Sequence, residues 1–273
     1  MTKKSTSAKK KHTVTPAVSQ AERQLALIQY HFLEEHNYTE AVRECESLLS
    51  YLPQRSSQRV DVLTFLGNAH GMLQNHPESY RAFNEALALE PQSYDLWFNR
   101  GQASLFTSRI GQAHKDFLRA RELDTKGELK KELEESLKLT EKGVADALKM
   151  RGPEFTLDQL IEQEEHFQHG MDLMEAGEWE DAEVHFRATI AMGDCLPQPW
   201  GNLGTCLMMQ ERYDEAEAAL QRALVIDPKY APAQQNLRLL PETRRNGLPT
   251  IFEVQDPFRN SKRQPSVRLL KES

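Results

Sequence analysis

The chain has 273 residues, of which 39% are hydrophobic and 27% charged, and its formal net charge is −7 at neutral pH. This composition excludes a fully disordered or collagen-like chain, and no apolar run is long enough to span a membrane. The lysine-rich start has no apolar run behind it, so we expect no secretory signal. Cys45, Cys195 and Cys206 are too scattered for a disulfide scaffold, which predicts a cytoplasmic protein.

Charge is distributed unevenly along the chain. Residues 1–21 contain five lysines and no acidic residue, and residues 241–273 contain seven basic and four acidic residues. The body between them, residues 22–240, therefore has a net charge of −15. Phosphate binding needs clustered Lys and Arg, so we do not expect the body to bind nucleic acid. Residues 1–21 are predicted to form a disordered basic arm.

Three related segments follow this arm, and in each the apolar residues are spaced as in a pair of amphipathic helices. They span residues 22–55, 60–93 and 94–127. Similar residues return at matching places: Leu25, Ile28, Phe32, Ala41 and Pro53 in the first; Leu63, Leu66, Gly67, Phe83, Ala86 and Pro91 in the second; Trp97, Gly101, Ala113, Phe117 and Ala120 in the third. Arg100 and Ser104 occupy apolar places of the third segment, so we expect irregular packing there.

Residues 128–162 interrupt the repetition. Their apolar residues lie mostly on one helical face, which predicts a helix over about 128–150. Gly152 and Pro153 end it, and Thr156 with Gln159 has the pattern of a capping box that opens the next helix. The predicted helix is either a cap on the first three segments or a bridge to the following ones, with a hinged or a rigid connection at Gly152-Pro153.

Two further segments, 163–196 and 197–230, resume the pattern, with Gly170, Leu173, Ala182 and Phe186 in the first and Trp200, Leu203, Gly204, Leu207, Ala216, Leu220, Ala223 and Pro228 in the second. Gly204 and Ala216 are small where two antiparallel helices would cross. Residues 231–240 are predicted to form a terminal helix that covers the last apolar face. We expect residues 241–273 to be a mostly disordered tail, in which the apolar run Leu248–Val254 is a candidate for docking on the body.

Residues 197–230 resemble the tetratricopeptide repeat (TPR) family at all of its signature positions, and the five segments together cover about 170 residues. The resemblance implies an all-α fold, a right-handed α-solenoid of stacked antiparallel helix pairs without strands. It also implies a function in protein–protein interaction: an adaptor or scaffold that binds a peptide or partner segment in the concave groove of the solenoid.

In this family the first helix of each unit lines the groove. The matching residues here are four asparagines and seven apolar residues: Asn68, Asn99, Asn202 and Asn236; Phe65, Phe98, Phe106, Met171, Met174, Met208 and Met209. An asparagine amide can pair with the backbone of an extended peptide, and the set resembles the asparagine ladder of TPR superhelices that hold unstructured substrates. Thr64 and Asp95 stand where chaperone-binding members have lysines, so a chaperone C-terminus is a poor candidate partner.

Catalytic and metal-binding patterns are weak. His166 and His169 share a helix face with Glu162 and Glu165, which is a spacing that metal ligands use, but both histidines fall at packing positions. Phosphate-binding glycine loops and a nucleophile elbow are absent from the sequence. We therefore predict no metal, no cofactor, no catalytic residues and no enzymatic activity.

Two other functions stay open at this point. The chain is alternatively a substrate-holding subunit of an enzyme complex, or a nucleic-acid-associated factor that acts through its basic tails. The sequence does not identify the partner or the oligomeric state, and it indicates no membrane partner.

Overall fold

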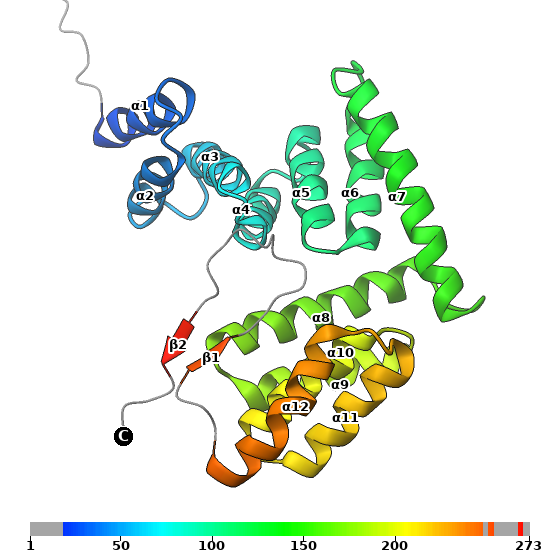
Figure 1. Ribbon diagram of the computed structural model, residues 1–273. Coiled ribbons are helices and arrows are strands. Elements are labelled where there is room, and N and C mark those ends of the chain that lie inside the picture. Colours follow the sequence, from blue (N-terminus) through cyan, green and yellow to red (C-terminus); the bar gives the residue numbers. More distant parts are fainter. Residues whose placement is uncertain (1–18, 248–250, 254–266, 270–273) are drawn as a thin grey trace, which may run out of the picture.

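The computed structural model describes residues 19–247, 251–253 and 267–269, which contain twelve helices and two short strands (Figure 1). The fold is all-α in its body, as predicted, and successive helices form antiparallel pairs. The helices are α1 Gln20–Leu33, α2 Tyr38–Leu49, α3 Ser57–Met72, α4 His76–Leu89, α5 Tyr94–Phe106, α6 Ile110–Leu123, α7 Lys130–Arg151, α8 Leu157–Ala176, α9 Trp179–Met192, α10 Pro197–Met209, α11 Tyr213–Ile226 and α12 Ala231–Asn246.

Four of the pairs cross at a glycine that faces a bulky side chain of the second helix. The contacts are Gly67 with Phe83, Gly101 with Phe117, Gly170 with Phe186 and Gly204 with Leu220. A Cβ added to any of these glycines would lie within 3.0 Å of the facing side chain. At Gly204 the carbonyl oxygen of Ala216 is also only 3.4 Å from the added Cβ, so the predicted crossing of these two helices is confirmed.

The pairs form two blocks. We call α1–α6 block one and α8–α12 block two. In block one the buried residues form successive small clusters, for example around Ile28, Leu63 and Phe117, each between neighbouring helices. Block two has one larger cluster, which runs from Met171 to Leu240. Each helix pair thus buries its apolar face against the next pair, which is how a helical solenoid gains its core.

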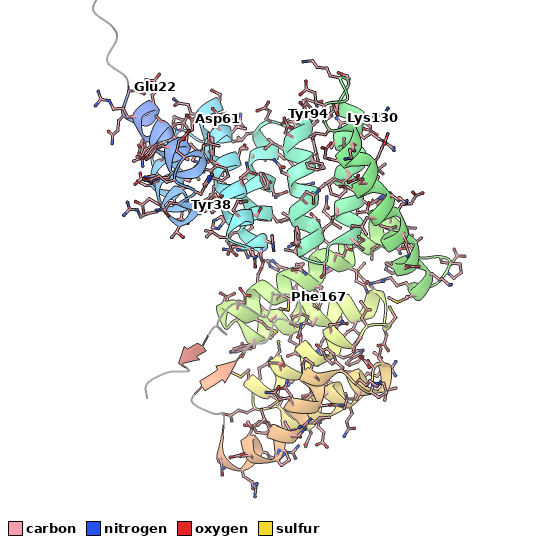
Figure 2. The ribbon with its side chains drawn as sticks, turned by 45° about the horizontal axis from the view of Figure 1, so that its top comes forward. Glu22, Tyr38, Asp61, Tyr94, Lys130 and Phe167 are labelled. Carbon is pink, nitrogen blue, oxygen red and sulfur yellow. The ribbon has the colours of Figure 1, made fainter. Side chains whose placement is uncertain are left out.

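Helix α7 packs on block one as the first helix of a further pair would. Its Leu133 and Leu137 join the cluster of Phe117 on α6. The Tyr94 hydroxyl at the start of α5 donates to Glu128 Oε2 at 2.5 Å, and Gln102 Nε2 donates to Ser136 Oγ at 3.3 Å. Both bonds join residues 34 positions apart, and the starts of α5 and α7 lie at one edge of the molecule (Figure 2). Helix α7 therefore covers the end of block one.

The chain turns sharply between α7 and α8 (Figure 1). Gly152 ends α7 with a φ of 108°, a conformation that L side chains rarely adopt, and the Thr156 capping box with Gln159 opens α8. Both predicted boundaries are confirmed. Helix α8 is longer than the other first helices of block two, and its N-terminal half reaches back to block one, where it contacts α6.

The C-terminal helix differs from the prediction. Helix α12 continues to Asn246 and contains Pro241, whereas Leu240 was the expected end. Pro241 has no N–H to donate to the carbonyl one turn earlier, so the helix continues past this residue with one backbone bond fewer. The expected absence of strands is also wrong at one place: β1 Ile251–Glu253 pairs antiparallel with β2 Val267–Leu269. Most of the basic arm and the rest of the run Leu248–Val254 lie outside the described residues.

Within the described ranges, no helix combines the length and the apolar character that crossing a bilayer requires.

Candidate functional site

The predicted groove residues of block one lie on α3 and α5 and are partly accessible. Asn68 and Asn99 are half-buried, and neither side-chain amide has a hydrogen-bond partner among the described residues. The Phe65 ring packs edge-on against Phe32, with the ring centroids 5.7 Å apart. Phe98 packs near Phe117 of α6, with its ring tilted and a centroid distance of 5.6 Å. Block one therefore presents free amides beside anchored rings.

Phe106 has a different setting at the C-terminal end of α5. Its side chain is 59% exposed and stacks on the ring of His76 at the start of α4, with the centroids 4.3 Å apart. It is the most exposed of the predicted groove residues for which the structure gives a burial, and it extends the surface of α3 and α5 toward α4.

The predicted groove residues of block two are mostly buried. Met171, Met174, Met208 and Met209 belong to the core, and Asn202 is 7% exposed. The Asn202 amide lies 3.0 Å from Met171 Sδ, which joins α10 to α8. Asn236 Nδ2 donates to Thr205 Oγ1 at 2.9 Å, which joins α12 to α10. In this structure these side chains pack first helices against one another, and a role in partner binding stays a prediction.

The irregularity expected at Arg100 and Ser104 is absent at Arg100, which has polar partners, whereas the Ser104 hydroxyl is buried without a hydrogen-bond partner among the described residues. The Arg100 guanidinium donates to both carboxylate oxygens of Asp116, at 2.8 and 2.6 Å, and to Asn84 Oδ1 at 2.5 Å. The Trp97 ring lies 4.8 Å from the guanidinium carbon. Burial alone would lower the pKa of Arg100, but its bonds to Asp116 outweigh burial and raise it. Each of the two helices, α5 and α6, therefore runs its length without an interruption.

Sequence reasoning missed Asp116 because the partner of a buried arginine can lie on any neighbouring helix. One signal was present: Asp116 stands beside Phe117 on the predicted buried face of its helix, where an unpaired carboxylate would be costly.

A second buried carboxylate joins the two blocks. Glu164 on α8 is 8% exposed and accepts bonds from the first amides of α6: Gly111 N donates at 2.9 and 3.1 Å, and Gln112 N at 3.2 Å. Helix α6 has no side-chain cap of its own, so Glu164 caps it from another element. Burial raises the pKa of Glu164 from 4.5 to about 7, although these bonds act in the opposite direction.

Two further bonds cross the same junction. Gln168 Nε2 on α8 donates to the Thr107 carbonyl at 2.8 Å, and Arg81 on α4 forms an ion pair of 2.7 Å with Asp172. The junction between the blocks thus combines apolar packing, for example of Gly111 against Ile161, with specific polar bonds.

The model of one known family matches part of the chain. The family is described as Tetratricopeptide repeat, and the match spans residues 197–230, which form α10, α11 and the turn after them. The glycine contact within this pair recurs in three other pairs. Residues 197–230 are thus a tetratricopeptide repeat.

One curated protein is similar to part of the chain. The peroxisomal targeting signal receptor of Yarrowia lipolytica is 32% identical over 81 residues, which are 29% of this chain and 14% of the receptor. This chain thus matches only a small part of that relative's length.

Solved structures of low sequence identity are also similar. The TPR domain of P58(IPK) is 12% identical, with 83% of this chain and 66% of that one covered and a TM-score of 0.43. The TPR2AB domain of yeast Sti1 in complex with pHSP90 is 14% identical, with 82% and 83% covered and a TM-score of 0.38. YrrB, described as a TPR protein with an unusual peptide-binding site, is 17% identical, with 81% and 93% covered and a TM-score of 0.37.

His166 and His169 of α8 meet a third histidine, His185, that the sequence did not indicate. His166 Nδ1 lies 3.1 Å from His185 Nδ1 on α9, and the His169 ring packs edge-on against His185 at 4.4 Å. Burial, together with the charges of His169 and His166, lowers the pKa of His185. Among the described residues, no group of three or more His, Cys, Asp or Glu side chains is arranged to hold a metal ion.

The three cysteines form no disulfide, and Cys45 and Cys206 are buried. Burial raises the pKa of Cys45 and that of Cys206 to about 12. A thiol with such a pKa holds little thiolate at neutral pH, so neither residue is suited to nucleophilic chemistry.

Proposed function

We propose that the chain is a protein-interaction adaptor that holds an extended segment of a partner protein along α3 and α5 of block one. The observation that carries the proposal is the pair of half-buried amides of Asn68 and Asn99, which have no partner among the described residues. An amide offers both a donor and an acceptor, so it pairs with a peptide backbone whatever the side chains of that peptide are.

The surroundings of the two amides support this function. Phe65 and Phe98 lie on the same two helices as the amides, and their rings are anchored by other aromatic rings, so they provide apolar contact area at little entropic cost. The similarity of part of the chain to a targeting signal receptor also favours a receptor-like role. The acidic body favours a partner segment without net negative charge.

The test starts with a partner identified by cross-linking and mass spectrometry and then measures its affinity for the purified chain. Replacing Asn68 and Asn99 together by Ala removes both amides and is expected to weaken binding by about 1–3 kcal/mol without lowering the melting temperature. Asn246→Ala, at an exposed position at the end of α12, is the matched control and should change neither quantity.

Asn202→Ala separates binding from packing. Because Asn202 is buried against Met171, its replacement is expected to lower the melting temperature of the chain and to leave its affinity for the partner unchanged. Unchanged affinity in the Asn68 and Asn99 double variant would refute the proposed groove.

We also propose that the chain acts without catalysis and in the cytoplasm, where unpaired cysteines persist. Turnover by the purified chain alone would contradict the first part. Partner binding that weakens steeply with added salt would instead favour a nucleic-acid-associated factor.

A further inference from the structure

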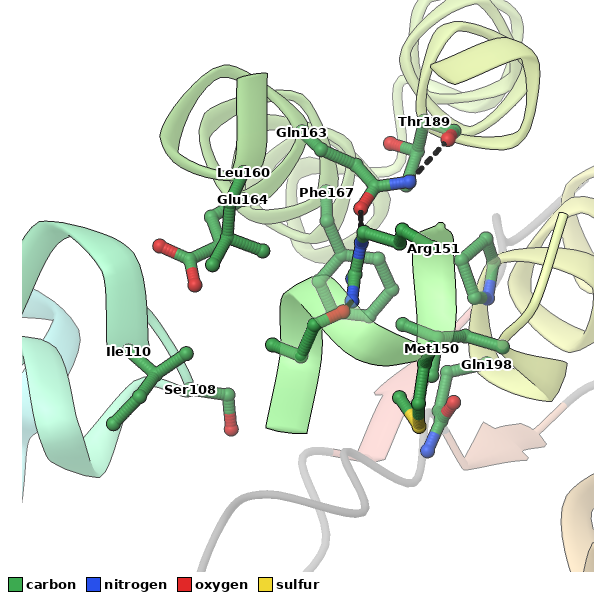
Figure 3. A pocket seen from close by; sticks show the side chains of 13 residues that line it. Ser108, Ile110, Met150, Arg151, Leu160, Gln163, Glu164, Phe167, Thr189 and Gln198 are labelled. Carbon is green, nitrogen blue, oxygen red and sulfur yellow. Dashed lines mark hydrogen bonds between the residues drawn. The ribbon is translucent and has the colours of Figure 1, made fainter. Parts of the chain in front are cut away.

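A cavity of about 250 Å³ lies where α7 meets block two (Figure 3). Its walls come from the end of α7, the middle of α8, Thr189 of α9, the start of α10 and the turn into α6. None of the predicted groove residues lines it. Because α7 belongs to no complete helix pair, this cavity depends on an element that the repeat pattern does not supply. We call it the α7–α10 cavity.

The walls of the cavity are largely apolar. The apolar side chains that line it include Ile110, Leu160, Phe167, Leu196 and Pro199. Met150 also lines it and is 56% exposed, so this flexible side chain stands at the rim. An engineered apolar cavity of about 150 Å³ binds benzene, so about 250 Å³ is room for one large side chain but not for a helix.

Most polar groups in the walls already have partners. Gln163 Oε1 accepts from Arg151 Nε at 2.6 Å, and Gln163 Nε2 donates to the Thr189 carbonyl at 2.9 Å (Figure 3). The Glu164 carboxylate is occupied by the amides of α6. The two charged residues of the wall are thus engaged within the protein, and the cavity offers no free charge to a ligand.

One acceptor in the wall is different. Gln198 Oε1, on the first turn of α10, is buried and has no hydrogen-bond partner among the described residues. A buried acceptor left without a donor destabilises the folded chain, because it loses the hydrogen bonds to water that it makes in the unfolded chain. A water molecule needs two to four polar partners to be held in a cavity, and Arg151, Gln163 and Glu164 in these walls already have partners within the protein. A donor for Gln198 Oε1 would therefore come from a group that its own ligand holds in place through other contacts with the cavity.

We propose that the α7–α10 cavity receives one large, uncharged apolar side chain of the partner segment, and that a main-chain N–H next to it donates to Gln198 Oε1. The proposal rests on the proposed function, since an apolar side chain beside a main-chain N–H is the repeating chemistry of a polypeptide. We take the segment to be extended at this point, because in an extended segment the main-chain N–H is not already bonded within the segment and can donate to Gln198 Oε1. The cavity thus selects partners by one apolar anchor.

The test uses N-acetyl-L-leucine N-methylamide as the probe and the full chain labelled with ¹³C in its Ile and Met methyl groups. Titration is expected to shift the methyl signals of Ile110 and Met150, whereas N-acetylglycine N-methylamide, which lacks the side chain, shifts neither. Gln198→Leu is expected to weaken binding of the leucine probe about 2- to 10-fold, the range of one hydrogen bond. Unmoved Ile110 and Met150 signals in the unmodified chain would overturn the proposal.

A pair of variants on α7 gives the matched control. Ala147 lines the cavity, so Ala147→Leu should fill it and abolish the shifts, whereas Ala145→Leu, at an exposed position of the same helix, should leave them unchanged. Shifts that persist in Ala147→Leu would place the probe elsewhere and refute the site.

Partner affinity then separates the two proposals. If it falls in the Asn68 and Asn99 double variant but not in Ala147→Leu, the groove stands and the cavity proposal fails. If Ala147→Leu alone weakens it, the cavity stands and the groove of block one fails.

Discussion

Replacing Glu164 by Gln tests how the two blocks are joined. The carboxylate is 8% exposed and caps α6 through bonds of 2.9–3.2 Å to Gly111 and Gln112. Burial, the larger effect, raises its pKa from 4.5 to about 7, against the pull of these bonds. The glutamine side chain of this variant keeps one acceptor for the α6 amides but cannot ionise.

The sign of the pH dependence follows from the raised pKa. Between pH 4.5 and about 7 the folded chain holds the Glu164 proton more tightly than the unfolded chain does. The contribution of Glu164 to stability is therefore full below pH 4.5 and is lost as the pH rises to about 7. At about 1.4 kcal/mol per unit of pKa difference, the free energy of unfolding falls by about 3 kcal/mol over this range. Glu164→Gln cannot ionise, so this pH-dependent loss is absent from the variant.

Urea unfolding followed by circular dichroism at pH 5, 6, 7 and 8 measures this effect. We expect the unmodified chain to lose about 3 kcal/mol relative to Glu164→Gln as the pH rises toward 8. Glu162→Gln, at an exposed position on the same helix, is the control and should follow the unmodified chain. A free-energy difference between the unmodified chain and Glu164→Gln that does not change with pH would refute the reasoning.

Two further predictions concern helix packing and thiol reactivity. Gly101→Ala places a Cβ 2.6 Å from the fully buried Phe117 ring and should lower the free energy of unfolding in urea by about 1–3 kcal/mol. The control is Gly71→Ala, whose Cβ would meet only a serine oxygen at 3.6 Å and which should be neutral or slightly stabilising. Equal losses of stability in the two variants would contradict the crossing geometry. At pH 7.5 a thiol reagent should modify the half-buried Cys195 in the folded chain, and Cys45 and Cys206 only after unfolding. Peptide mass spectrometry measures the order of modification. Rapid labelling of Cys45 and Cys206 in the folded chain would disprove their burial.

The sequence predicted the helix pairs well because their determinants are local. A glycine and a bulky residue at fixed spacing, as in Gly101 and Phe117, fix where two consecutive helices cross. The capping box of Thr156 was equally readable, since its partners lie three residues apart. Such features need no knowledge of distant neighbours.

The candidate sites were less predictable because their partners come from different elements. The Gln198 acceptor is unpaired, whereas the nearby polar groups of Arg151 on α7 and Gln163 on α8 bond to each other. The Glu164 cap joins residues that lie more than fifty positions apart. The burial of Met208 depends on how closely successive first helices approach, which the spacing of apolar residues within one helix does not encode.

The 34-residue register of α7 on α5 has a consequence for synthesis on the ribosome. Helix α7, which covers the end of block one, is complete once Arg151 has emerged from the ribosome. The core of block one can therefore close before any part of α8 is available. Until then the first amides of α6 face water, and Glu164 reaches them only when the next helix arrives. The second block thus begins to fold with a finished surface to dock against, and the order of translation matches the order in which the contacts become possible.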